Sequence, residues 1–420
     1  MICNWRGELS DKINFARQMH GTTLAFGSGL SYGDSCLAVS DHVLHMRPLD
    51  RFISVDWATG VLRAEAGVTL DDVLTLSIPR GWFVPVTPGT KYVTLGGAIA
   101  NDVHGKNHHR RGTFGCHVRG FSLRRSDTGP MACSPKQHAE LFNATIGGLG
   151  LTGVIEWAEI QLAPIRSSRI NCLVQRFGDL DEFFALSAEL EATHEFCVSW
   201  IDCAATGKSN GRGIYMAGDF ASDGQLTVER ARKRSIPLTP PTSLINRISL
   251  RGFNEIYWRK APRSRRSLTA GYDSFFYPLD GIKKWNRIYG PNGFQQYQAL
   301  IPDCESQAGI RALLKAIAES GTGSFLAVLK RCGDVPSPGL LSFPRPGTTL
   351  ALDFPQTEQL TTTLFPRLDA ILREMGGRIY PAKDAHISGE DFRRSFPAWT
   401  KVEALRDPAL LSRFWKRVTQ

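Results

Sequence analysis

The sequence predicts an α+β protein of more than one domain, and three observations support this prediction. The chain has 420 residues, 42% of them hydrophobic, which is enough for two or three domains of about 150 residues each. Residues 42–81 pass from strand-like to turn-like to helix-like patterns, as in a mixed fold. After Pro164 a stretch crowded with glycine gives way to longer apolar segments, so we expect a domain boundary near residue 165.

The first strands and the first helix are predicted between residues 42 and 81. Apolar and polar residues alternate over 42–66, with a turn at 58–60, which indicates short strands and a hairpin. Thr69 followed by Asp72 resembles the N-cap of a helix, and Gly81 follows its end.

Apolar periodicity predicts further elements along the rest of the chain. Alternating or continuous apolar runs indicate strands, whereas apolar residues recurring at helical spacing indicate helices. The predicted strands cover 154–162, 325–330, 348–354 and 378–380. The predicted helices cover 180–194, 313–319, 361–373 and a last segment through Phe414 and Trp415.

The positive charge of the chain is concentrated in one segment. The chain has 50 Lys and Arg against 40 Asp and Glu, a net charge of +10, and residues 229–266 hold eleven basic and two acidic residues. This segment carries +9 of the total, and we expect it to form a mobile loop. A local basic segment favours a local anionic partner or a membrane face, whereas a nucleic-acid-binding protein is expected to be basic over more of its surface. We therefore expect no nucleic-acid partner.

Cysteine usage and apolar run lengths indicate where the protein works. The nine cysteines are scattered and form no C-x-x-C pair, which is typical of a reduced protein. The first residues lack the charged and apolar regions of a signal peptide, and no run reaches ~18 apolar residues. We expect a protein that is not exported by a standard signal and does not span a bilayer. Its expected location is the cytoplasm or the inner membrane face, as a peripheral protein.

Two glycine-rich stretches are suited to backbone contact with a cofactor. In Phe26-Gly-Ser-Gly-Leu-Ser-Tyr-Gly-Asp34 the glycine spacing differs from the G-x-G-x-x-G dinucleotide motif, and no amphipathic helix follows. Its backbone amides can cradle a pyrophosphate, and a plain glycine turn is the alternative. Ala144-Thr-Ile-Gly-Gly-Leu-Gly-Leu-Thr-Gly153 likewise suits a flat or phosphorylated cofactor.

A third stretch combines glycines with histidines and includes Asp102-Val-His-Gly-Lys-Asn-His-His109. His104 and His108 are four residues apart, which on a helix is the spacing of a metal pair. Gly105 and Gly112 disfavour a helix here, and no Cys or Glu stands at ligand spacing, so we predict no metal site. Surface histidines in a loop are the alternative to a functional role.

Taken together, these stretches resemble the FAD-binding domain of the vanillyl-alcohol oxidase superfamily, of the PCMH type. The segment Asp102 to His109 is similar to the more specific motif of the decaprenylphosphoryl-ribose 2-prime-oxidases. The resemblance continues in order through Tyr277-Pro-Leu-Asp280, Trp285-Asn-Arg287, Tyr289 to Gln298, Val328-Leu-Lys-Arg331, Leu352-Asp-Phe-Pro355 and Gly377 to Asp384. It therefore covers nearly the whole chain.

The resemblance implies a fold and a reaction. The implied fold is a two-subdomain FAD-binding domain, formed by 1–165 and a C-terminal return over 376–420, with an inserted α+β substrate domain over 166–375 built on an antiparallel sheet. The implied reaction is oxidation of a secondary hydroxyl of a furanose, carried on a polyprenyl phosphate, to a ketone by hydride transfer to N5 of noncovalent FAD. This would be the first half of an epimerisation in cell-wall polysaccharide biosynthesis, with a separate NAD(P)H-dependent reductase taking the ketone.

The resemblance also assigns residues to the cofactor. The amides of 27–32 and 95–97 should hold the pyrophosphate, 148–153 should line the flavin and adenosine, and Tyr380 should lie beside the isoalloxazine. The expected set is Gly27, Ser28, Gly29, Leu30, Ser31, Tyr32, Leu95, Gly96, Gly97, Asn101, His104, Gly105, Asn107, Gly148, Gly150, Gly153, Val154 and Tyr380.

On the substrate side, Lys383 matches the lysine of the family's Ala-Lys-Asp motif. A lysine near flavin in a desolvated pocket can polarise the reacting hydroxyl or act as its base, and a surface ion pair with Asp384 is the alternative. His104 and Lys106 match the first His and the Lys of the family's histidine motif, and should position the sugar or its phosphate.

Two further substrate-side matches lie on predicted strands. Gln296 and Gln298 should hydrogen-bond sugar hydroxyls or the flavin edge, unless they form one solvent-facing stripe. Lys330 matches a substrate-side lysine of the family, and an ordinary strand lysine is the alternative.

Two positions depart from the pattern of the family. Ala351 stands in place of a substrate-facing cysteine, and Phe276 stands in place of a tyrosine. The alternative function is that of a soluble alditol or sugar-lactone oxidase of the same superfamily. Lys330 and Lys383, together with the basic segment, favour a phosphorylated and membrane-presented substrate instead.

Overall fold

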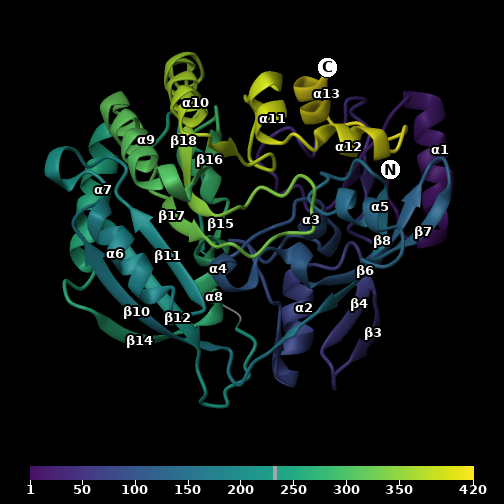
Figure 1. Cartoon of the computed structure of the whole chain (residues 1–420), viewed down its shortest axis with the longest axis horizontal. Helices are drawn as coiled ribbons and strands as arrows, with labels where there is room; N and C mark the ends of the chain where they lie inside the picture. The colour runs from purple at the N-terminus through teal and green to yellow at the C-terminus, as the bar shows by residue number, and fades with distance from the viewer. Residues whose placement is uncertain (230–233) are drawn as a thin grey trace.

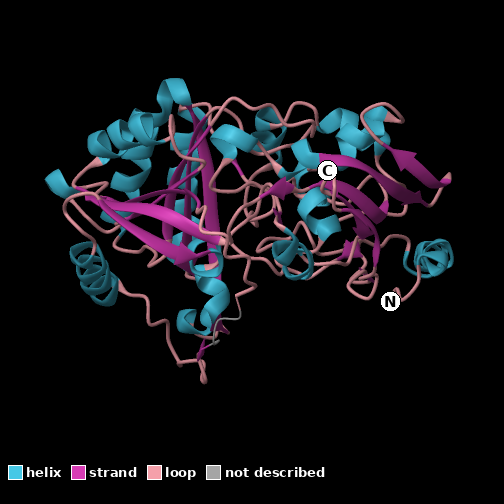
Figure 2. Cartoon of the chain, turned by 90° about the horizontal axis from the view of Figure 1, so that it is seen from below, coloured by secondary structure: helices cyan, strands magenta, loops and turns pink. Residues whose placement is uncertain are grey.

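Two β-sheets, one in each half of the molecule, organise the chain. The computed structural model describes residues 1–229 and 234–420. Figure 2 shows the strands gathered in two groups, with both chain ends in the half that holds the smaller group. The prediction of an α+β fold with antiparallel sheets is confirmed.

The smaller sheet has five antiparallel strands in the order β3-β4-β8-β6-β7. Its strands are β3 (Phe52–Asp56), β4 (Val61–Glu65), β6 (Val118–Arg125), β7 (Gly129–Cys133) and β8 (Val154–Gln161). The helices α2 (Leu70–Ser77) and α3 (Leu95–Ala100) add their apolar residues to the core of this sheet. The predicted cap at Thr69 is confirmed: its hydroxyl accepts from the Asp72 amide and the Asp72 carboxylate accepts from the Thr69 amide.

The larger sheet has eight antiparallel strands in the order β14-β10-β12-β11-β17-β18-β16-β19. Its strands are β10 (Arg169–Phe177), β11 (Phe196–Ile201), β12 (Gly213–Phe220), β14 (Arg266–Gly271), β16 (Phe294–Pro302), β17 (Ala327–Cys332), β18 (Gly347–Pro355) and β19 (Arg378–Ile379). The helices α6 (Leu180–Leu190), α9 (Ser306–Ser320) and α10 (Phe365–Glu374) cover one face of this sheet and build the largest apolar core with it.

The remaining elements of the described residues are three pairs of short strands, eight α-helices and several single helical turns. The short strands pair as β1 (Ala25–Phe26) with β2 (Leu44–His45), β5 (Trp82–Phe83) with β9 (Ala163–Pro164), and β13 (Arg234–Ser235) with β15 (Ile282–Lys283). The other α-helices are α1 (Leu9–His20), α4 (His108–Arg111), α5 (Ala139–Thr145), α7 (Arg247–Lys260), α8 (Tyr272–Phe276), α11 (Gly389–Ser395), α12 (Trp399–Leu405) and α13 (Arg413–Thr419). One π-helical turn, η8 (Leu360–Leu364), precedes α10, and 3₁₀ turns occupy Arg6–Glu8, Ile78–Arg80, Phe114–His117, Gly207–Ser209, Pro278–Gly281, Trp285–Tyr289 and Asp303–Glu305.

The end of the chain contacts both halves. The strand β19 pairs with β16 at one edge of the larger sheet. Further along, Leu410 forms a β-bridge with Thr23, and Ser412 forms one with Ala38. The C-terminal segment thus connects the larger sheet to the N-terminal residues, and the division into 1–165, 166–375 and 376–420 stays a prediction.

Two local predictions were wrong. The basic segment 229–266, predicted as a mobile loop, contains the helix α7, which Asn246 caps by accepting from the Ser249 amide. Residues 230–233 of this segment lie outside the described residues. The histidine motif, where glycines disfavoured a helix, contains the single turn α4, which Gly112 ends with φ of +69°.

Candidate functional site

A cavity of about 720 Å³ lies between the two halves. This volume is within the range of small-molecule and cofactor sites. One wall consists of glycine-rich backbone from the N-terminal half, and the other consists of side chains on the larger sheet.

The N-terminal wall exposes backbone donors. The N–H groups of Ser28, Gly29, Leu30 and Ser31 donate no hydrogen bond within the described residues, and all four residues line the cavity. Further along, the loop runs beside the segment that carries Lys383, because the Tyr32 amide donates to Ala382 O and the Asp34 amide to Asp384 O. Unpaired backbone N–H groups on a glycine loop are suited to binding a phosphate.

In the second glycine segment of this wall, residues 95–97, the backbone N–H groups already donate hydrogen bonds within the protein. The amides of Leu95, Gly96 and Gly97 donate to Val68 O, Ala66 O and Thr94 Oγ1, respectively. Because these three N–H groups start and anchor α3, this segment supplies close packing rather than free donors. The glycines are needed for space, since a Cβ on Gly96 would lie 3.0 Å from the Cβ of Ala66.

The cavity brings together most of the residues that the sequence predicted. Its lining includes Gly27, Ser28, Gly29, Leu30, Ser31, Tyr32, Gly96, Gly97, Asn101, His104, Gly105, Lys106, Gly150, Gly153, Gln298, Lys330, Tyr380 and Lys383.

Four predicted cofactor residues are not among those that line the cavity. Leu95 is buried in the core of the smaller sheet, and Val154 packs in the apolar cluster of the N-terminal residues. The Asn107 side chain donates to Pro85 O, and Gly148 lies against the carbonyl of Ala144. In this structure each of the four serves packing or a local hydrogen bond, and their assignment to the cofactor stays a prediction.

Sequence reasoning missed several lining residues. Asp353 lies in Leu352-Asp-Phe-Pro355, a segment of the resemblance to which no role was assigned, and the Thr87-Pro-Gly-Thr90 turn also lines the cavity. Trp200 and Tyr257 also line the cavity, and neither belongs to a motif.

Alternate residues of neighbouring strands build the sheet wall. On β18, Thr349, Ala351 and Asp353 all line the cavity. Ala351 pairs with Gln298 of β16 on one side and with Val328 of β17 on the other. Gln296 and Gln298, two residues apart on β16, both face the cavity rather than a solvent stripe, as the period-two argument predicts.

His104 forms the centre of a hydrogen-bonded group between the two walls. Its Nδ1 lies 2.7 Å from Lys330 Nζ and its Nε2 lies 3.2 Å from Gln298 Nε2. Lys330 also donates to Gly105 O at 2.6 Å. Burial lowers the pKa of His104 well below its usual value, and Lys330 adds to this effect. The imidazole is therefore neutral at pH 7 and is fixed in orientation from both sides.

Lys383 lies between the glycine loop and a buried carboxylate. Its Nζ is 3.8 Å from the centre of the Tyr32 ring. Burial lowers the pKa of Lys383 to about 8, although Asp353 opposes this shift. Burial also raises the pKa of Asp353 to about 7, against a hydrogen bond of 2.6 Å from Gln296 and the charge of Lys383. Both groups can therefore change their protonation near neutral pH.

Lys106 adds a third lysine to the cavity. Its ammonium donates to Phe275 O and lies 4.4 Å from the centre of the Phe275 ring. Burial lowers the pKa of Lys106 to about 8, with Lys330 adding to the shift. The cavity therefore holds three lysines with lowered pKa values, Lys106, Lys330 and Lys383, besides Lys283, and their mutual repulsion favours an anionic ligand.

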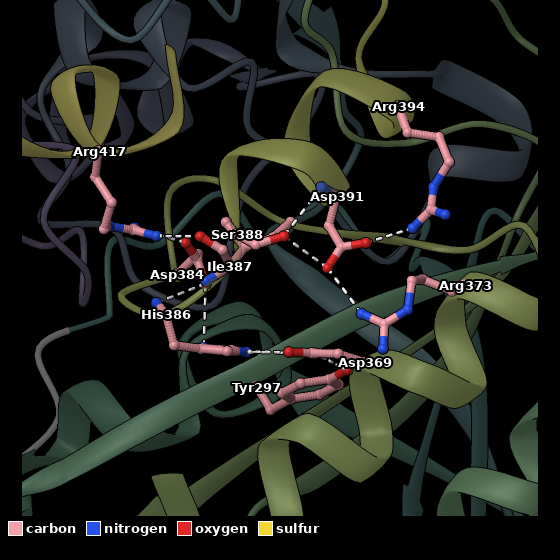
Figure 3. Close-up of polar contacts among 10 residues, drawn as sticks. All are labelled: Tyr297, Asp369, Arg373, Asp384, His386, Ile387, Ser388, Asp391, Arg394 and Arg417. Carbon is pink, nitrogen blue, oxygen red and sulfur yellow. Dashed lines mark hydrogen bonds and ion pairs between the residues drawn. The ribbon is translucent and has the colours of Figure 1, made fainter. Parts of the chain in front are cut away.

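An ionic network holds the segment that follows Lys383 (Figure 3). Arg417 bridges two carboxylates, at 2.9 Å from Asp34 and 2.8 Å from the fully buried Asp384. His386 lies 3.2 Å from Asp384 and 3.3 Å from Asp369, and these carboxylates raise its pKa against the effect of burial. Because Asp34 ends the glycine loop, the network fixes that loop and the Lys383 segment together.

The two motif histidines do not form part of a metal cluster. Both ring nitrogens of His108 are buried without a hydrogen-bond partner. Over the described ranges 1–229 and 234–420, no group of three or more His, Cys, Asp or Glu side chains could hold a metal ion.

Known proteins are similar to this chain over its N-terminal part and, in two cases, over most of its length. Residues 2–129 match the family model described as an FAD binding domain. The chain is 34% identical to the decaprenylphosphoryl-beta-D-ribose oxidase of Mycolicibacterium smegmatis, over 92% of this chain and 86% of that protein. It is 32% identical to a Streptomyces coelicolor protein described as uncharacterized, in the mprA 5′ region, over 81% of this chain and 95% of that one. The L-gulonolactone oxidase of Mus musculus is 28% identical over 38% of this chain and 36% of its own length.

Proposed function

Because the chain belongs to the decaprenylphosphoryl-beta-D-ribose oxidase family, we propose that it oxidises a secondary hydroxyl of a polyprenyl-phosphoryl furanose to a ketone. The chain is an FAD-dependent oxidoreductase. The proposed reaction is the first half of an epimerisation, and a separate NAD(P)H-dependent reductase takes the ketone. The proposed location is peripheral, at the inner membrane face. The observation that carries the proposal is a cavity with free backbone donors on one wall and Lys383 beside them.

The N-terminal wall fits FAD. The four unpaired amides of 28–31 suit a pyrophosphate, and the amides of Gly89 and Thr90 likewise donate no hydrogen bond among the described residues. A Cβ on Gly27 would lie 2.4 Å from Thr94 Oγ1, so only glycine leaves this approach open. We propose noncovalent binding, with Tyr380 beside the flavin ring, within the two-subdomain PCMH-type arrangement.

Bound FAD supplies the acceptor for the hydride that leaves the carbinol carbon. As the hydride leaves, the hydroxyl proton must also leave, and Lys383 is the proposed acceptor. Its pKa of about 8 keeps a substantial fraction of the amine neutral near pH 7 to 8. The ammonium formed is stabilised by the Asp353 carboxylate, whose pKa of about 7 leaves it largely ionised at pH 8.

His104 and the residues bonded to it are proposed to orient the sugar. Lys330 fixes His104 from one side and Gln298 from the other, so the imidazole presents one defined edge to the cavity. Because the ammonium of Lys330 is already used by His104 and Gly105 O, we assign it a positioning role rather than a direct substrate contact.

A phosphorylated substrate fits the charge of the cavity better than a neutral sugar does. Lys106 and the buried Lys330 have lowered pKa values, and a phosphate on their side of the cavity would stabilise their charged forms. A soluble sugar-lactone oxidase, the alternative, gains nothing from these charges. The similarity to L-gulonolactone oxidase is also limited to about a third of each chain.

The proposed role of Lys383 is tested by Lys383→Met under anaerobic conditions. The variant should bind FAD normally, and flavin reduction by a polyprenyl-phosphoryl ribose should slow by about 10²- to 10⁴-fold, because the proton acceptor is lost. Lys136→Met, at an exposed position, is the control and should reduce its flavin at the wild-type rate. Wild-type rates in Lys383→Met would remove this residue from the mechanism, and a wild type that reduces its flavin only with unphosphorylated sugars would favour the alternative.

A further inference from the structure

The helix α7 presents an apolar ridge to the outside of the protein. Residues four apart lie on one stripe of a helix, and Ile248, Gly252 and Ile256 form such a stripe. Ile248 is 85% exposed and Ile256 is 59% exposed. The opposite stripe, Leu250 and Asn254, is the one that packs on the protein. The helix therefore has apolar residues on its outer face as well as on its inner face.

Positive charges flank this ridge. Arg247, Arg251 and Arg259 lie on the adjacent stripe, with Glu255 as its one acidic member. Glu255 forms ion pairs with Arg259 and Arg212, whereas Arg247 and Arg251 have no acidic partner among the described residues. Exposed apolar residues bordered by cations are the pattern of a helix that lies in the surface of an anionic membrane.

The ridge continues into the wall of the cavity. Phe253 is 44% exposed and its ring stacks on Tyr257, with 5.7 Å between the ring centres. The Tyr257 ring in turn contacts Trp200 edge to face at 4.9 Å, and both residues line the cavity. Val328, beside them on β17, lines the cavity and is 39% exposed. An apolar path formed by Phe253, Tyr257, Trp200 and Val328 therefore leads from α7 to the substrate side of the cavity.

We propose that the ridge of α7 inserts into the surface of an anionic lipid bilayer and brings the mouth of the cavity to that surface. This proposal rests on the proposed function, because a polyprenyl-phosphoryl sugar is held in a bilayer by its lipid and must enter the cavity from there. The apolar path supplies a route for the prenyl chain, while the phosphate moves toward the cavity lysines. Membrane contact thus comes from a folded helix rather than from a loose basic loop.

The charges favour a lipid surface over a second copy of this chain. Two copies packed through α7 would bring Arg247, Arg251 and Arg259 of each close to those of the other, which is unfavourable at short range. Anionic headgroups instead pair with these side chains while the isoleucines enter the acyl region. No helix in the described part of the chain is long and apolar enough to cross a bilayer.

The test is co-sedimentation of the FAD-loaded protein with vesicles of equal parts phosphatidylglycerol and phosphatidylcholine. Wild-type protein should bind these vesicles and bind pure phosphatidylcholine less. The double variant Ile248→Ser, Ile256→Ser should bind about 100-fold more weakly, because each buried isoleucine contributes about tenfold. Arg247→Gln with Arg251→Gln should weaken binding to the anionic vesicles by about 25-fold, and added salt should remove most of that difference.

The matched control lies at the other end of the molecule. Phe15 and Met19 of α1 are similarly exposed, and Figure 1 shows α1 and α7 at opposite edges. Phe15→Ser with Met19→Ser should therefore leave vesicle binding unchanged. The proposal would be overturned if the wild type and the isoleucine variant bound vesicles equally well. It would also be overturned if neither protein bound vesicles and the wild type formed a dimer that the isoleucine substitutions dissociated.

A water-soluble substrate with a short prenyl chain separates this proposal from the proposed function. The isoleucine variant should reduce its flavin with that substrate at the wild-type rate, because neither isoleucine lines the cavity. If the wild-type protein bound vesicles through α7 but its flavin was not reduced by the short-chain substrate, the proposed function would be wrong. The proposal that α7 binds the membrane would still hold.

Discussion

The two walls of the cavity recognise their ligands by different means. The N-terminal wall presents main chain, with glycines at Gly27 and Gly29 and unpaired amides beside them. The sheet wall presents side chains, one from every second residue of strands that lie side by side. At Gly27 and Gly29 the main-chain wall has no room for a side chain, since an added Cβ would lie 2.4 and 2.5 Å from its nearest neighbour, whereas a wall of strand side chains can exchange one residue and keep its fold.

This contrast predicts different roles for the two walls. Backbone recognition suits a cofactor that every member shares, and the glycine motifs are intact in this chain. Side-chain recognition suits a substrate, and both departures from the family pattern, Ala351 and Phe276, line the cavity. Substitutions on the first wall should therefore abolish flavin binding, and those on the second should change turnover while flavin stays bound.

The largest effect is expected from Gly33→Ala, where the backbone wall meets the Lys383 segment. A Cβ on Gly33 would lie 1.7 Å from Asp384 O, a main-chain atom held by the ladder between 32–34 and 382–384. We expect a loss on the order of 4–5 kcal/mol in the free energy of unfolding and little bound flavin. Urea unfolding and the ratio of flavin to protein absorbance measure both. Gly7→Ala is the control, because an added Cβ at Gly7 would have no atom within 4 Å. A Gly33→Ala protein that binds as much flavin as the wild type would contradict the prediction.

The next effect concerns the network that ties the two walls together. Arg417→Met leaves the fully buried Asp384 without its arginine, which should lower the free energy of unfolding by about 3–5 kcal/mol. Flavin should also dissociate more readily, because Asp34 at the end of the glycine loop loses the same partner. Lys416→Met, at an exposed neighbour, should change neither quantity. An Arg417→Met protein with the free energy of unfolding of the wild type would show that the ionic network does not stabilise the fold.

A smaller effect, on pH dependence alone, is expected at Asp353. If neutral Lys383 accepts the proton, the rate of flavin reduction rises with pH through the lysine pKa of about 8. Asp353→Asn removes a carboxylate that stabilises the ammonium, so the pKa of Lys383 falls and the rise moves to lower pH. Stopped-flow reduction across pH measures this shift. Asp280→Asn, which removes a second carboxylate of the cavity, is the control and should not change the pH dependence of flavin reduction. If Asp353→Asn also left this pH dependence unchanged, Lys383 would not be the group that titrates.

The smallest effect is expected at Ala351 on the sheet wall. Ala351→Val adds two methyl groups between Gln298 and Val328, so substrate should fit less well and KM should rise by about tenfold. The ratio of flavin to protein should not change, because the backbone wall is untouched. A loss of flavin in this variant would show that the sheet wall also contributes to cofactor binding.

Much of the local structure followed from residue patterns. The cap at Thr69, the helix at 180–190 and the strands over 154–161 and 347–355 depend on neighbours in sequence, and their positions were predicted to within a few residues. The helix α7 was missed because pattern analysis expects one apolar face, toward the core. In α7 Leu250 faces inward and Ile248 outward, so no single apolar stripe is visible in the sequence.

The candidate site could be predicted only in part. The glycine motifs indicated the backbone wall, because clustered glycines allow the main chain to approach a bound group closely. They could not show that the amides of 28–31 are unpaired while those of 95–97 are used, since that depends on which carbonyls lie nearby in space. The same limit applies to Trp200 and Tyr257, which reach the cavity from elements without a motif.

The sequence by itself determined the composition of the two walls: which residues are glycine, which strands alternate, and that the excess charge lies in 229–266. Only the tertiary structure decided how these parts act together. Lys330 meets His104 across 226 positions of chain, and Arg417 meets Asp34 across 383. Such contacts shift pKa values and fix orientation through burial and distance, which depend on the folded arrangement rather than on neighbours in the sequence.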